Sequence, residues 1–285
     1  MKVLVYGHKG WIGGQFVSII KDKLDYVLGE SRVDNVGGVL CELDVHRPTH
    51  VISFIGRTHG KIDDKVFATI DYLEQPGKLK ENVCDNLFSP LSLALTCKDR
   101  GIHYTYLGTG CIFNYTNETR GFTESDVPNF FGSSYSIVKG FTDRLMHQLD
   151  DCVLNLRIRM PIVGYDNPRN FITKIVQYEK ICSVPNSMSV LSELLPIVLD
   201  MMKQKMVGTV NMTNPGVISH NEILELYKEY VDPSFTWHNF SIEEQRKILA
   251  SERSNNLLDT SRLEQFAPHV RTIKQAVKEL LMQYS

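Results

Sequence analysis

The sequence has no paired cysteines, no long apolar run and no strong net charge. Its six cysteines lie far apart and form no Cys-x-x-Cys pair, so we expect reduced thiols and no structural metal site. No apolar stretch approaches the ~18 residues that a membrane span needs. The formal net charge is −2, too small for a basic field that would attract nucleic acid or an anionic membrane. These absences predict a cytoplasmic protein that binds neither nucleic acid nor membranes and holds no metal.

The first residues also lack the features of a secretory signal. Met1 and Lys2 are followed at once by a short apolar run and glycines, without an h-region or a small-residue cleavage site. We therefore interpret two Asn-x-Thr tripeptides, at 114–116 and 117–119, as turn residues and not as glycosylation sites.

What the sequence does contain is an alternation of apolar runs, glycine turns and amphipathic segments. Hydrophobic residues make up 42% of the 285 positions and charged residues 22%, which is typical of a globular protein. Apolar runs that we interpret as strands lie at 2–6, 26–28, 51–55, 103–107 and 152–158. Segments with helical spacing lie at 11–24, 86–97 and around 135–139. The alternation predicts an α/β fold with a Rossmann-type, doubly wound parallel sheet.

A glycine-rich turn follows the first predicted strand. Gly7, Gly10 and Gly13 are spaced three apart, and the predicted helix begins at Trp11 and Ile12. At such a turn the backbone approaches a pyrophosphate closely, and the free N–H groups and dipole of the helix favour the anion. These five residues are candidates for binding a dinucleotide. The alternative is a tight turn whose glycines serve only packing.

The end of the second predicted strand bears on the choice of cofactor. An acidic residue at this place usually binds the ribose 2′-hydroxyl of NAD, whereas an arginine accommodates the 2′-phosphate of NADP. Ser31 and Arg32 favour NADPH, and Glu30 favours NADH. We expect NADPH, with NADH as a less preferred cofactor. The alternative role of Arg32 is that of a solvated loop charge.

The character of the chain changes after about residue 160, where the rhythm of glycine turns fades. Capping-box patterns at Ser219-x-x-Glu222 and Ser241-x-x-Glu244 predict helices near 220–230 and 242–250. We therefore expect an NADPH-binding Rossmann domain at 1–160 and a smaller substrate-binding lobe at 161–285, with some segments of the lobe returning to the main sheet.

Tyr135 and Lys139 are four residues apart on a predicted helix, so their side chains share one face. A lysine cation beside a tyrosine favours the phenolate and is expected to lower the pKa of Tyr135 toward the working range of a proton donor. The spacing alone is weak evidence for a catalytic pair, because many helices carry such a pair on a solvated face.

Thr109 and Cys111 follow the predicted strand at 103–107. Two residues apart in an extended segment, they point to the same face. A thiol there would lie beside a hydroxyl at the carboxyl edge of the sheet, where ligands of open α/β sheets bind. The alternatives are that Cys111 fills space in the core and that Thr109 is a turn hydroxyl.

These features resemble the extended short-chain dehydrogenase/reductase family. Further motifs narrow the resemblance to the plant nucleotide-rhamnose synthases, which are bifunctional 3,5-epimerase/4-reductases acting on UDP-4-keto-6-deoxyglucose. The motifs cover nearly the whole chain: Thr109-Gly-Cys111-Ile-Phe, Pro128-Asn-Phe-Phe-Gly132, Arg157-Ile-Arg-Met-Pro161, Asn167-Pro-Arg-Asn-Phe-Ile-Thr-Lys174, Pro185-Asn-Ser-Met188, Thr213-Asn-Pro-Gly216, Ser219-His-Asn-Glu-Ile-Leu224 and Arg253-Ser-Asn-Asn256. The segment 57–80 departs from the plant pattern.

The resemblance implies a role for each matched residue. Thr109 matches the hydroxyl that binds the 4-keto oxygen, Tyr135 the proton donor, and Lys139 the lysine that contacts the nicotinamide ribose. Cys111 and Lys174 match the epimerase pair, although by spacing alone Lys174 would be a surface lysine of an amphipathic helix. Arg32 matches an arginine for the NADPH 2′-phosphate, and Asn86, which falls where the family has an asparagine in the helix behind the site, is a candidate for the substrate site. Because arginine forks suit phosphate oxygens, further candidates for binding the nucleotide diphosphate and base are Arg57, Arg159, Arg169, Asn170, Arg253 and Asn256. The alternative for each of them is a solvated or structural role.

The resemblance further implies that the protein makes UDP-L-rhamnose with NADPH, as a homodimer, from a substrate that a separate 4,6-dehydratase supplies. Two other functions remain open. One is a reductase resembling the dTDP-4-dehydrorhamnose reductases, which has no need of a Cys111/Lys174 pair. The other is a regulatory subunit that binds NADP without turnover, which the Tyr135/Lys139 pair disfavours.

Overall fold

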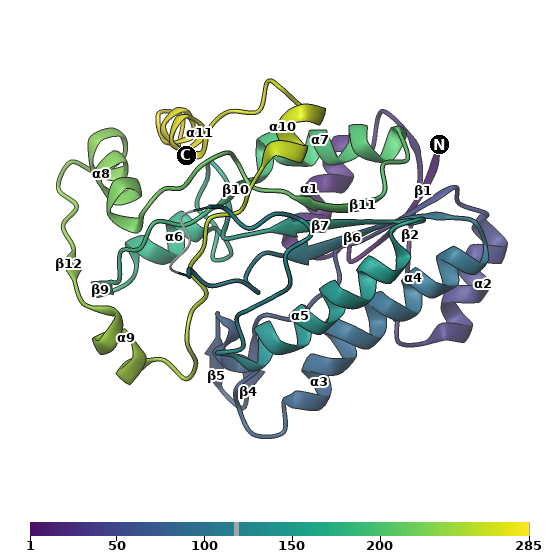
Figure 1. Ribbon diagram of the computed structural model, residues 1–285, viewed down its shortest axis with the longest axis horizontal. Helices are drawn as coiled ribbons and strands as arrows, with labels where there is room; N and C mark the ends of the chain where they lie inside the picture. The colour runs from purple at the N-terminus through teal and green to yellow at the C-terminus, as the bar shows by residue number, and fades with distance from the viewer. Residues whose placement is uncertain (117–119, 285) are drawn as a thin grey trace.

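The computed structural model describes residues 1–116 and 120–284; the tripeptide 117–119 lies outside the described residues. Six strands form one sheet in the order β11-β7-β6-β3-β1-β2, and every neighbouring pair is parallel. These strands are β1 (Lys2–Tyr6), β2 (Asp25–Leu28), β3 (His50–Ser53), β6 (His103–Thr109), β7 (Val153–Ile158) and β11 (Gly208–Asn211). The predicted Rossmann-type parallel sheet is confirmed (Figure 1).

Helices cover both faces of this sheet, because its strands are apolar on both sides. In β1, Val3 and Val5 belong to the core on one face, whereas Leu4 and Tyr6 belong to the core on the other. Figure 1 shows the two helical layers on either side of the strands. The first layer contains α1 (Trp11–Ile20), α7 (Leu191–Lys203) and α10 (Ser261–Phe266), and the second contains α2 (Val36–His46), α4 (Ser89–Asp99) and α5 (Ser134–Met146).

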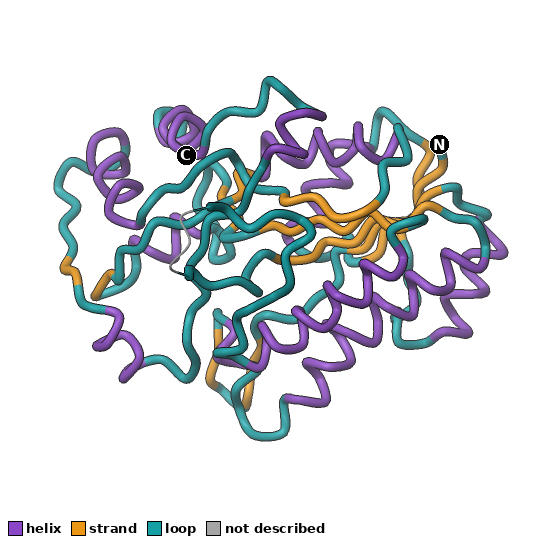
Figure 2. The backbone as a smooth tube through the Cα atoms, viewed as in Figure 1, coloured by secondary structure: helices purple, strands orange, loops and turns teal. Residues whose placement is uncertain are grey.

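A third apolar cluster forms the lobe beyond the carboxyl ends of the strands, among loops that Figure 2 shows in teal. Its helices are α6 (Phe171–Val176), α8 (His220–Tyr230) and α11 (Ile273–Leu281), and α9 (Ile242–Ile248) lies at its edge. Two short parallel pairs complete the lobe: β8 (Pro161–Ile162) with β10 (Ser189–Val190), and β9 (Lys180–Ile181) with β12 (His238–Asn239). Both predicted capping boxes are formed and open α8 and α9.

Part of the chain beyond residue 160 packs with the main sheet. The helix α7 packs into the same core as β1 and α1, and β11 extends the main sheet beside β7. Residues 191–211 therefore belong to the sheet layer, and the expected division into two domains at residue 160 stays a prediction.

The helix predicted at 86–97 begins earlier and is interrupted. It starts as α3 (Leu79–Val83), passes through a π-helical turn at Cys84–Phe88 and continues as α4. An unbroken α-helix would bond the N–H of residue 90 to the carbonyl of Asn86, but Pro90 has no N–H. The Thr142 hydroxyl of α5 donates to that carbonyl instead, at 2.6 Å. The interruption therefore ties α4 to α5.

Other elements had no counterpart in the sequence-based predictions. Among them are α2, α7, β11, α10, α11, an antiparallel hairpin of β4 (Gly60–Ile62) and β5 (Lys65–Phe67), and 3₁₀ turns at Ile70–Tyr72 and His147–Leu149. Within the described residues, no helix is long and apolar enough to cross a membrane.

Candidate active site

The glycine turn after β1 has the geometry that close approach to a dinucleotide requires. Gly7 has a φ of +76°, which favours glycine, and its carbonyl accepts the N–H of Gly10 at 3.0 Å. A Cβ on Gly13 would lie 2.2 Å from the Gly7 carbonyl oxygen, so only glycine fits there. Gly10 caps α1 without a side-chain hydrogen bond, which leaves the first N–H groups of the helix, at Trp11 and Ile12, to face a ligand.

The turn after β2 is held by Glu42 of α2. One carboxylate oxygen of Glu42 accepts the backbone N–H groups of Glu30 and Ser31 at 2.8 and 2.7 Å, and the other accepts the Tyr6 hydroxyl at 2.7 Å. Arg32 extends from this turn into solvent, where its guanidinium pairs with both oxygens of Asp34 at 3.0 and 2.8 Å. Ser31 and Arg32 therefore lie at the end of β2, and their role in binding a dinucleotide stays a prediction. Nothing in the sequence pattern pointed to Glu42.

The amino end of α5 is bound to the strand end that carries Thr109 and Cys111. Ser133 caps the helix by accepting the N–H of Ser136 at 3.0 Å. The Ser136 hydroxyl then donates to the Cys111 carbonyl at 2.8 Å. Tyr135 lies between Ser133 and Ser136 in the first turn of the helix. These bonds therefore fix the tyrosine against the end of β6.

Tyr135, Thr109 and Cys111 lie together, as predicted. The Thr109 hydroxyl accepts the N–H of Cys111 at 3.1 Å. The Cys111 side chain is half-buried and packs in one apolar cluster with Tyr135 and Tyr72. Burial raises the pKa of Tyr135 above its ordinary value, the nearby Cys111 raises it further, and a hydrogen bond with Thr109 opposes the rise. The tyrosine hydroxyl is therefore protonated at neutral pH and available as a donor.

The expected lowering of the Tyr135 pKa by Lys139 is wrong for this structure. The Lys139 ammonium contacts the hydroxyl of Tyr106 on β6 and lies 4.6 Å from the centre of that ring. Burial lowers the pKa of Lys139 to about 8, and Asp143 and Cys111 oppose the change. The spacing predicted that Tyr135 and Lys139 share one face of the helix. The Lys139 ammonium is nevertheless directed to Tyr106, whose hydroxyl is its hydrogen-bond partner inside the protein.

Asn86 lies behind the site, where its amide braces the loop after β3. The Arg57 N–H donates to the Asn86 amide oxygen at 2.9 Å, and the Asn86 amide nitrogen donates to the Arg57 carbonyl at 2.9 Å and to Asn82 at 2.8 Å. The side chain is almost entirely buried. Asn86 therefore orders backbone and is not placed to contact a substrate directly.

Lys174 reaches the same side of the sheet from the lobe. Its ammonium donates to the carbonyl of Ala68 at 3.3 Å. Phe67 and Ile70, on either side of Ala68 and Thr69, pack in the cluster that contains Cys111. Burial and the neighbouring Arg169 lower the pKa of Lys174. The predicted epimerase pair thus borders one common segment, the chain from Phe67 to Ile70.

Two predicted substrate residues are internal supports, and their assignment is corrected. Arg159 is 1% exposed, and its guanidinium donates to Asn186 and Asn256 at 2.8 Å each and to the Ser254 carbonyl at 2.9 Å. Asn170 is fully buried and caps α6. Both side chains form their hydrogen bonds with other residues of the chain.

The expected role of Arg253 in binding the substrate stays a prediction. Its guanidinium pairs with Asp71 at 2.6 Å and borders a groove under α9. That groove is also lined by Asn114, Tyr115, Val184, Arg246 and Asn255.

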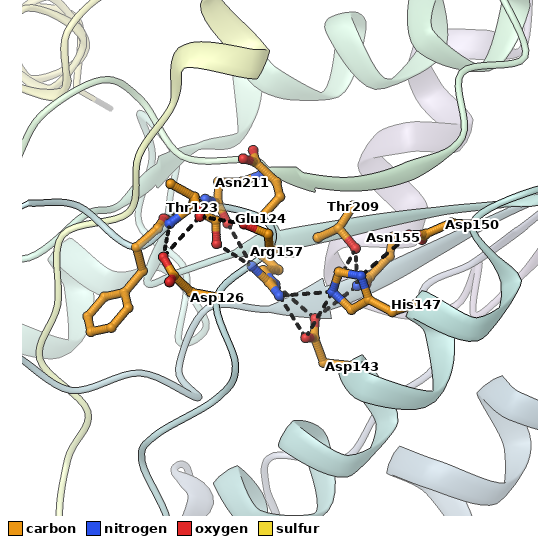
Figure 3. A network of polar contacts seen from close by, with 12 residues as sticks. Thr123, Glu124, Asp126, Asp143, His147, Asp150, Asn155, Arg157, Thr209 and Asn211 are labelled. Atoms are coloured by element: carbon orange, nitrogen blue, oxygen red, sulfur yellow. Dashed lines mark hydrogen bonds and ion pairs between the residues drawn. The ribbon is translucent and has the colours of Figure 1, made fainter.

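A buried ion pair fixes the other end of α5 to the sheet (Figure 3). Arg157 of β7, which is fully buried, donates to both carboxylate oxygens of Asp143 at 2.8 and 2.7 Å. Asn155 donates to Asp143 at 2.9 Å, and His147 lies 3.6 Å from the same carboxylate. Arg157 also donates to the Thr123 carbonyl at 3.2 Å. The helix that bears Tyr135 and Lys139 is therefore fastened at both ends.

No group of three or more His, Cys, Asp or Glu side chains that could hold a metal ion occurs in residues 1–116 and 120–284. The chemical groups that do meet at the carboxyl edge of the sheet are a glycine cradle, a protonated phenol, a hydroxyl and a thiol, with an ammonium across from them. Such a set suits proton transfer at a carbonyl compound beside a bound dinucleotide.

Comparison with known proteins agrees with a site made of these chemical groups. No model of a known protein family matches the chain. The protein L780 of Acanthamoeba polyphaga mimivirus is 53% identical over 99% of this chain and 98% of its own. Its crystal structure, described as that of a UDP-rhamnose synthase, superimposes with a TM-score of 0.95 over 99% of both chains.

Two relatives from Arabidopsis thaliana extend the match. A bifunctional dTDP-4-dehydrorhamnose 3,5-epimerase/dTDP-4-dehydrorhamnose reductase is 41% identical over 96% of this chain and 90% of its own. A trifunctional UDP-glucose 4,6-dehydratase/3,5-epimerase/reductase is 41% identical, but 97% of this chain covers only 41% of that protein.

A dTDP-4-dehydrorhamnose reductase from Bacillus anthracis, solved in complex with NADP, shares the fold with a TM-score of 0.81 at 15% identity. Sequence identity over nearly the full length, the common fold and the arrangement around Tyr135 all agree. The chain belongs to the nucleotide-rhamnose synthases, a family of enzymes within the extended short-chain dehydrogenase/reductases that combine 3,5-epimerase and 4-reductase activities.

Proposed function

We propose that this enzyme converts UDP-4-keto-6-deoxy-D-glucose to UDP-L-rhamnose by epimerisation at C3 and C5 followed by reduction at C4. The observation that carries the proposal is the meeting of Thr109, Cys111 and Tyr135 at one strand end, with Lys174 bordering the same segment. A reductase alone needs the tyrosine and not the thiol.

The epimerisation uses the acidity that the 4-ketone gives to the C–H bonds at C3 and C5. The Cys111 thiolate removes a proton from one face of the sugar and becomes a thiol. The Thr109 hydroxyl donates a hydrogen bond to the enolate oxygen that develops. The Lys174 ammonium then gives a proton to the same carbon from the opposite face, which inverts the centre and leaves a neutral amine. Exchange of both groups with solvent restores them.

The reduction needs a proton at the C4 oxygen. We assign this donation to Tyr135, because burial keeps its hydroxyl protonated and the hydroxyl bonds with Thr109, the proposed partner of the ketone. When bound, a reduced nicotinamide supplies the hydride. Lys139, beside Tyr106, would hold the nicotinamide ribose.

The residues present fit a nicotinamide dinucleotide, and we propose NADPH as the preferred form. A Cβ at Gly13 would strike the Gly7 carbonyl, so the turn is shaped for backbone to approach a pyrophosphate. Arg32 is exposed at the end of β2 and can turn from Asp34 to a 2′-phosphate. Asp34 and Glu30 lie at the same edge, which explains why NADH would remain a weaker substitute.

The substrate must come from a 4,6-dehydratase. The trifunctional plant relative includes that activity in its name, and this chain covers only 41% of its length. We propose a separate dehydratase as the partner reaction. The cytoplasmic location expected from the sequence stays a prediction.

The two activities are expected to appear in one assay. In deuterated water without cofactor, the protein should incorporate deuterium at C3 and C5 of UDP-4-keto-6-deoxyglucose, measured by NMR. With NADPH it should yield UDP-rhamnose and oxidise the cofactor, and NADH should act more slowly. We expect Cys111→Ala to lose deuterium incorporation by about 10²-fold or more, since general-base catalysis contributes about that much.

Cys152→Ala is the matched control, because Cys152 is also half-buried but precedes β7 at the opposite end of the sheet. Reduction of an already epimerised substrate without any deuterium exchange would identify a reductase alone. Binding of NADPH with neither exchange nor oxidation would identify a regulatory subunit. Exchange that survives in Cys111→Ala would remove the thiol from the mechanism.

We also propose a homodimer formed through α4 and α5. These neighbouring helices expose Phe88 just before α4, Leu95 on α4, and Ile137 and Phe141 on α5, and large exposed apolar side chains on neighbouring helices favour an interaction surface. Phe141→Asp is expected to shift the sedimentation coefficient from that of a dimer to that of a monomer. Val45→Asp on α2, which replaces another exposed apolar residue, should not. A monomeric wild-type protein would refute this proposal.

A further inference from the structure

The segment noted above as a departure from the family pattern, residues 57–80, reaches across to the lobe. It leaves the carboxyl end of β3, forms the β4–β5 hairpin and returns through Ala68. Two contacts join it to α6 and the turn before α6. Lys174 donates to the Ala68 carbonyl at 3.3 Å, and the Arg169 guanidinium donates to Nδ1 of His59. His59, Arg169 and Lys174 form what we call the basic cluster.

The charges of the basic cluster have no acidic counterpart among the described residues. Arg57, at the start of the segment, pairs with Asp85 at 2.8 Å and with Glu81 at 3.4 Å. For Arg169 and Lys174, no ion pair with a carboxylate is found in residues 1–116 and 120–284. Two half-buried cations without counterions are costly to place side by side. Such an arrangement is more typical of a functional site than of a structural one.

His59 holds Arg169 without cancelling its charge. Burial, together with the charges of Arg169, Arg57 and Lys174, lowers the pKa of His59 to about 4, so the imidazole is neutral at neutral pH. A guanidinium can only donate hydrogen bonds, and a neutral imidazole nitrogen can accept one. A carboxylate at the same place would also accept the bond, but it would neutralise the guanidinium.

The titratable groups around α6 come from four parts of the chain. Arg169 precedes the helix, and His59 and Arg57 belong to the segment after β3. Asp166 and the carboxyl-terminal Tyr284 hydrogen-bond with Thr173, and His220 of α8 contacts Phe171, so these three groups neighbour other residues of α6 than Lys174. The one carboxylate in this set, Asp166, accepts the Thr173 hydroxyl at 2.8 Å. The charge felt by Lys174 is therefore dominated by Arg169, which with burial lowers the Lys174 pKa.

The geometry points to His59 and Arg169 as positioning residues of the epimerase half-reaction: the neutral imidazole orients a guanidinium whose unbalanced charge beside Lys174 drives release of the ammonium proton to the sugar carbon. The inference rests on the proposed function, in which Lys174 is the acid. In this step a C–H bond forms at the enolate carbon as an N–H bond of Lys174 breaks. The neutral amine that remains is favoured over the ammonium beside Arg169, and a solvent proton later restores it.

The test compares Arg169→Gln with Arg169→Lys, which keeps the charge. The pH dependence of C3/C5 epimerisation is followed by NMR, and reduction of UDP-4-keto-L-rhamnose by NADPH absorbance. For Arg169→Gln, we expect epimerisation at pH 7 to slow about fivefold to tenfold, as Brønsted behaviour predicts for a weaker acid, and the alkaline limb of its pH profile to move to higher pH. Arg169→Lys should keep the wild-type limb, and reduction should change in neither variant.

His59→Phe removes the acceptor and should shift the alkaline limb in the same direction, by a smaller amount. It keeps the inference testable if Arg169→Gln fails to fold. NMR titration of lysines labelled with ¹³C at Cε gives a readout that does not depend on turnover. There the Lys174 pKa should rise in Arg169→Gln and stay unchanged in Arg100→Gln, whose arginine pairs with Asp44 far from the site.

An unchanged alkaline limb and Lys174 pKa in Arg169→Gln would overturn the inference. So would a rise in KM of both half-reactions with an unchanged profile, because Arg169 would then bind the substrate diphosphate. Failure of the proposed function is recognised separately, since the wild-type protein itself would then show no epimerisation.

Discussion

Tyr135→Phe is expected to lower the rate of C4 reduction by about 10²–10⁴-fold, the range that a positioned proton donor contributes. Deuterium incorporation at C3 and C5 should stay within a few-fold of the wild-type rate, because the thiol, the Thr109 hydroxyl and Lys174 remain in place. The substitution removes one hydroxyl from a side chain that is 8% exposed and leaves the ring in its apolar cluster. Loss of its hydrogen bond with Thr109 costs about 0.5–1.5 kcal/mol of stability, too little to unfold the protein.

The matched control is Tyr104→Phe. Tyr104 lies on β6, is fully buried and loses the same atom, but it lies at the amino end of the strand, far from Thr109. NADPH oxidation and deuterium exchange should both be unchanged in this variant. Equal loss of both activities in folded Tyr135→Phe would show that the tyrosine also stabilises the enolate. Full reduction in Tyr135→Phe would show that another group donates the proton.

The parts of the site that could be predicted from the sequence depend on local spacing. Gly7 and Gly13 follow a strand and open a helix, so a chain segment of about a dozen residues sets their geometry. The capping box at Ser219 likewise needs only four residues, and α8 begins where that pattern placed it. Tyr135 came from the same kind of local pattern, which fixed its helix face.

The sequence-based predictions were wrong where the hydrogen-bond partner that positions a side chain is distant in the chain. Lys139 was assigned to Tyr135 because they share a helix face, but its ammonium meets Tyr106 on a strand 33 residues earlier. Arginine suits phosphate by its chemistry, and so Arg159 was assigned to the substrate. Its partner Asn256 lies 97 residues further on, and the resulting burial cannot be seen from residue type.

The hairpin at 60–67 is another case in which the important contacts are distant in the chain. Residues 57–80 match no family motif, so the resemblance assigned them no role. Only the folded chain brings His59 to Arg169, 110 residues away, and Ala68 to Lys174, 106 residues away. The resemblance pointed to Cys111 and Lys174, and the fold adds the segment that lies between them.

The buried pair of Asp143 and Arg157 carries the largest stability prediction. Asp143→Asn keeps the shape of the side chain but leaves the fully buried Arg157 without its counterion. Removing one partner of a buried ion pair costs about 3–5 kcal/mol, a large part of the total stability of a typical domain. Urea unfolding at pH 7 measures this loss as a lower midpoint at an unchanged slope. Replacing both partners, in Asp143→Leu/Arg157→Met, should cost less than the two single losses together.

The pH dependence of this loss has a definite sign. Burial alone would raise the pKa of Asp143, but hydrogen bonds from Arg157 and His147 and the charge of Arg157 hold it well below the ordinary value of 3.8. A carboxylate with a depressed pKa in the folded state stabilises the protein fully above its unfolded value and loses that contribution as the pH falls further. The difference in unfolding free energy between wild type and Asp143→Asn should therefore be constant near neutral pH and shrink below about pH 4. A difference that grows on acidification would show that Asp143 is not the ionised partner of Arg157.

Asp143→Asn is also expected to affect the active site, because Asp143 and Lys139 both lie on α5. Asp143 lies one helical turn after Lys139, and its charge is the largest factor opposing the fall of the Lys139 pKa. Without that charge the Lys139 pKa should fall below about 8, so the alkaline limb of the C4 reduction profile should move to lower pH. Epimerisation by Cys111 and Lys174 does not use Lys139 and should keep its profile. A shift of both profiles together would mean that Asp143→Asn displaces the whole helix and does not act on Lys139 through its charge.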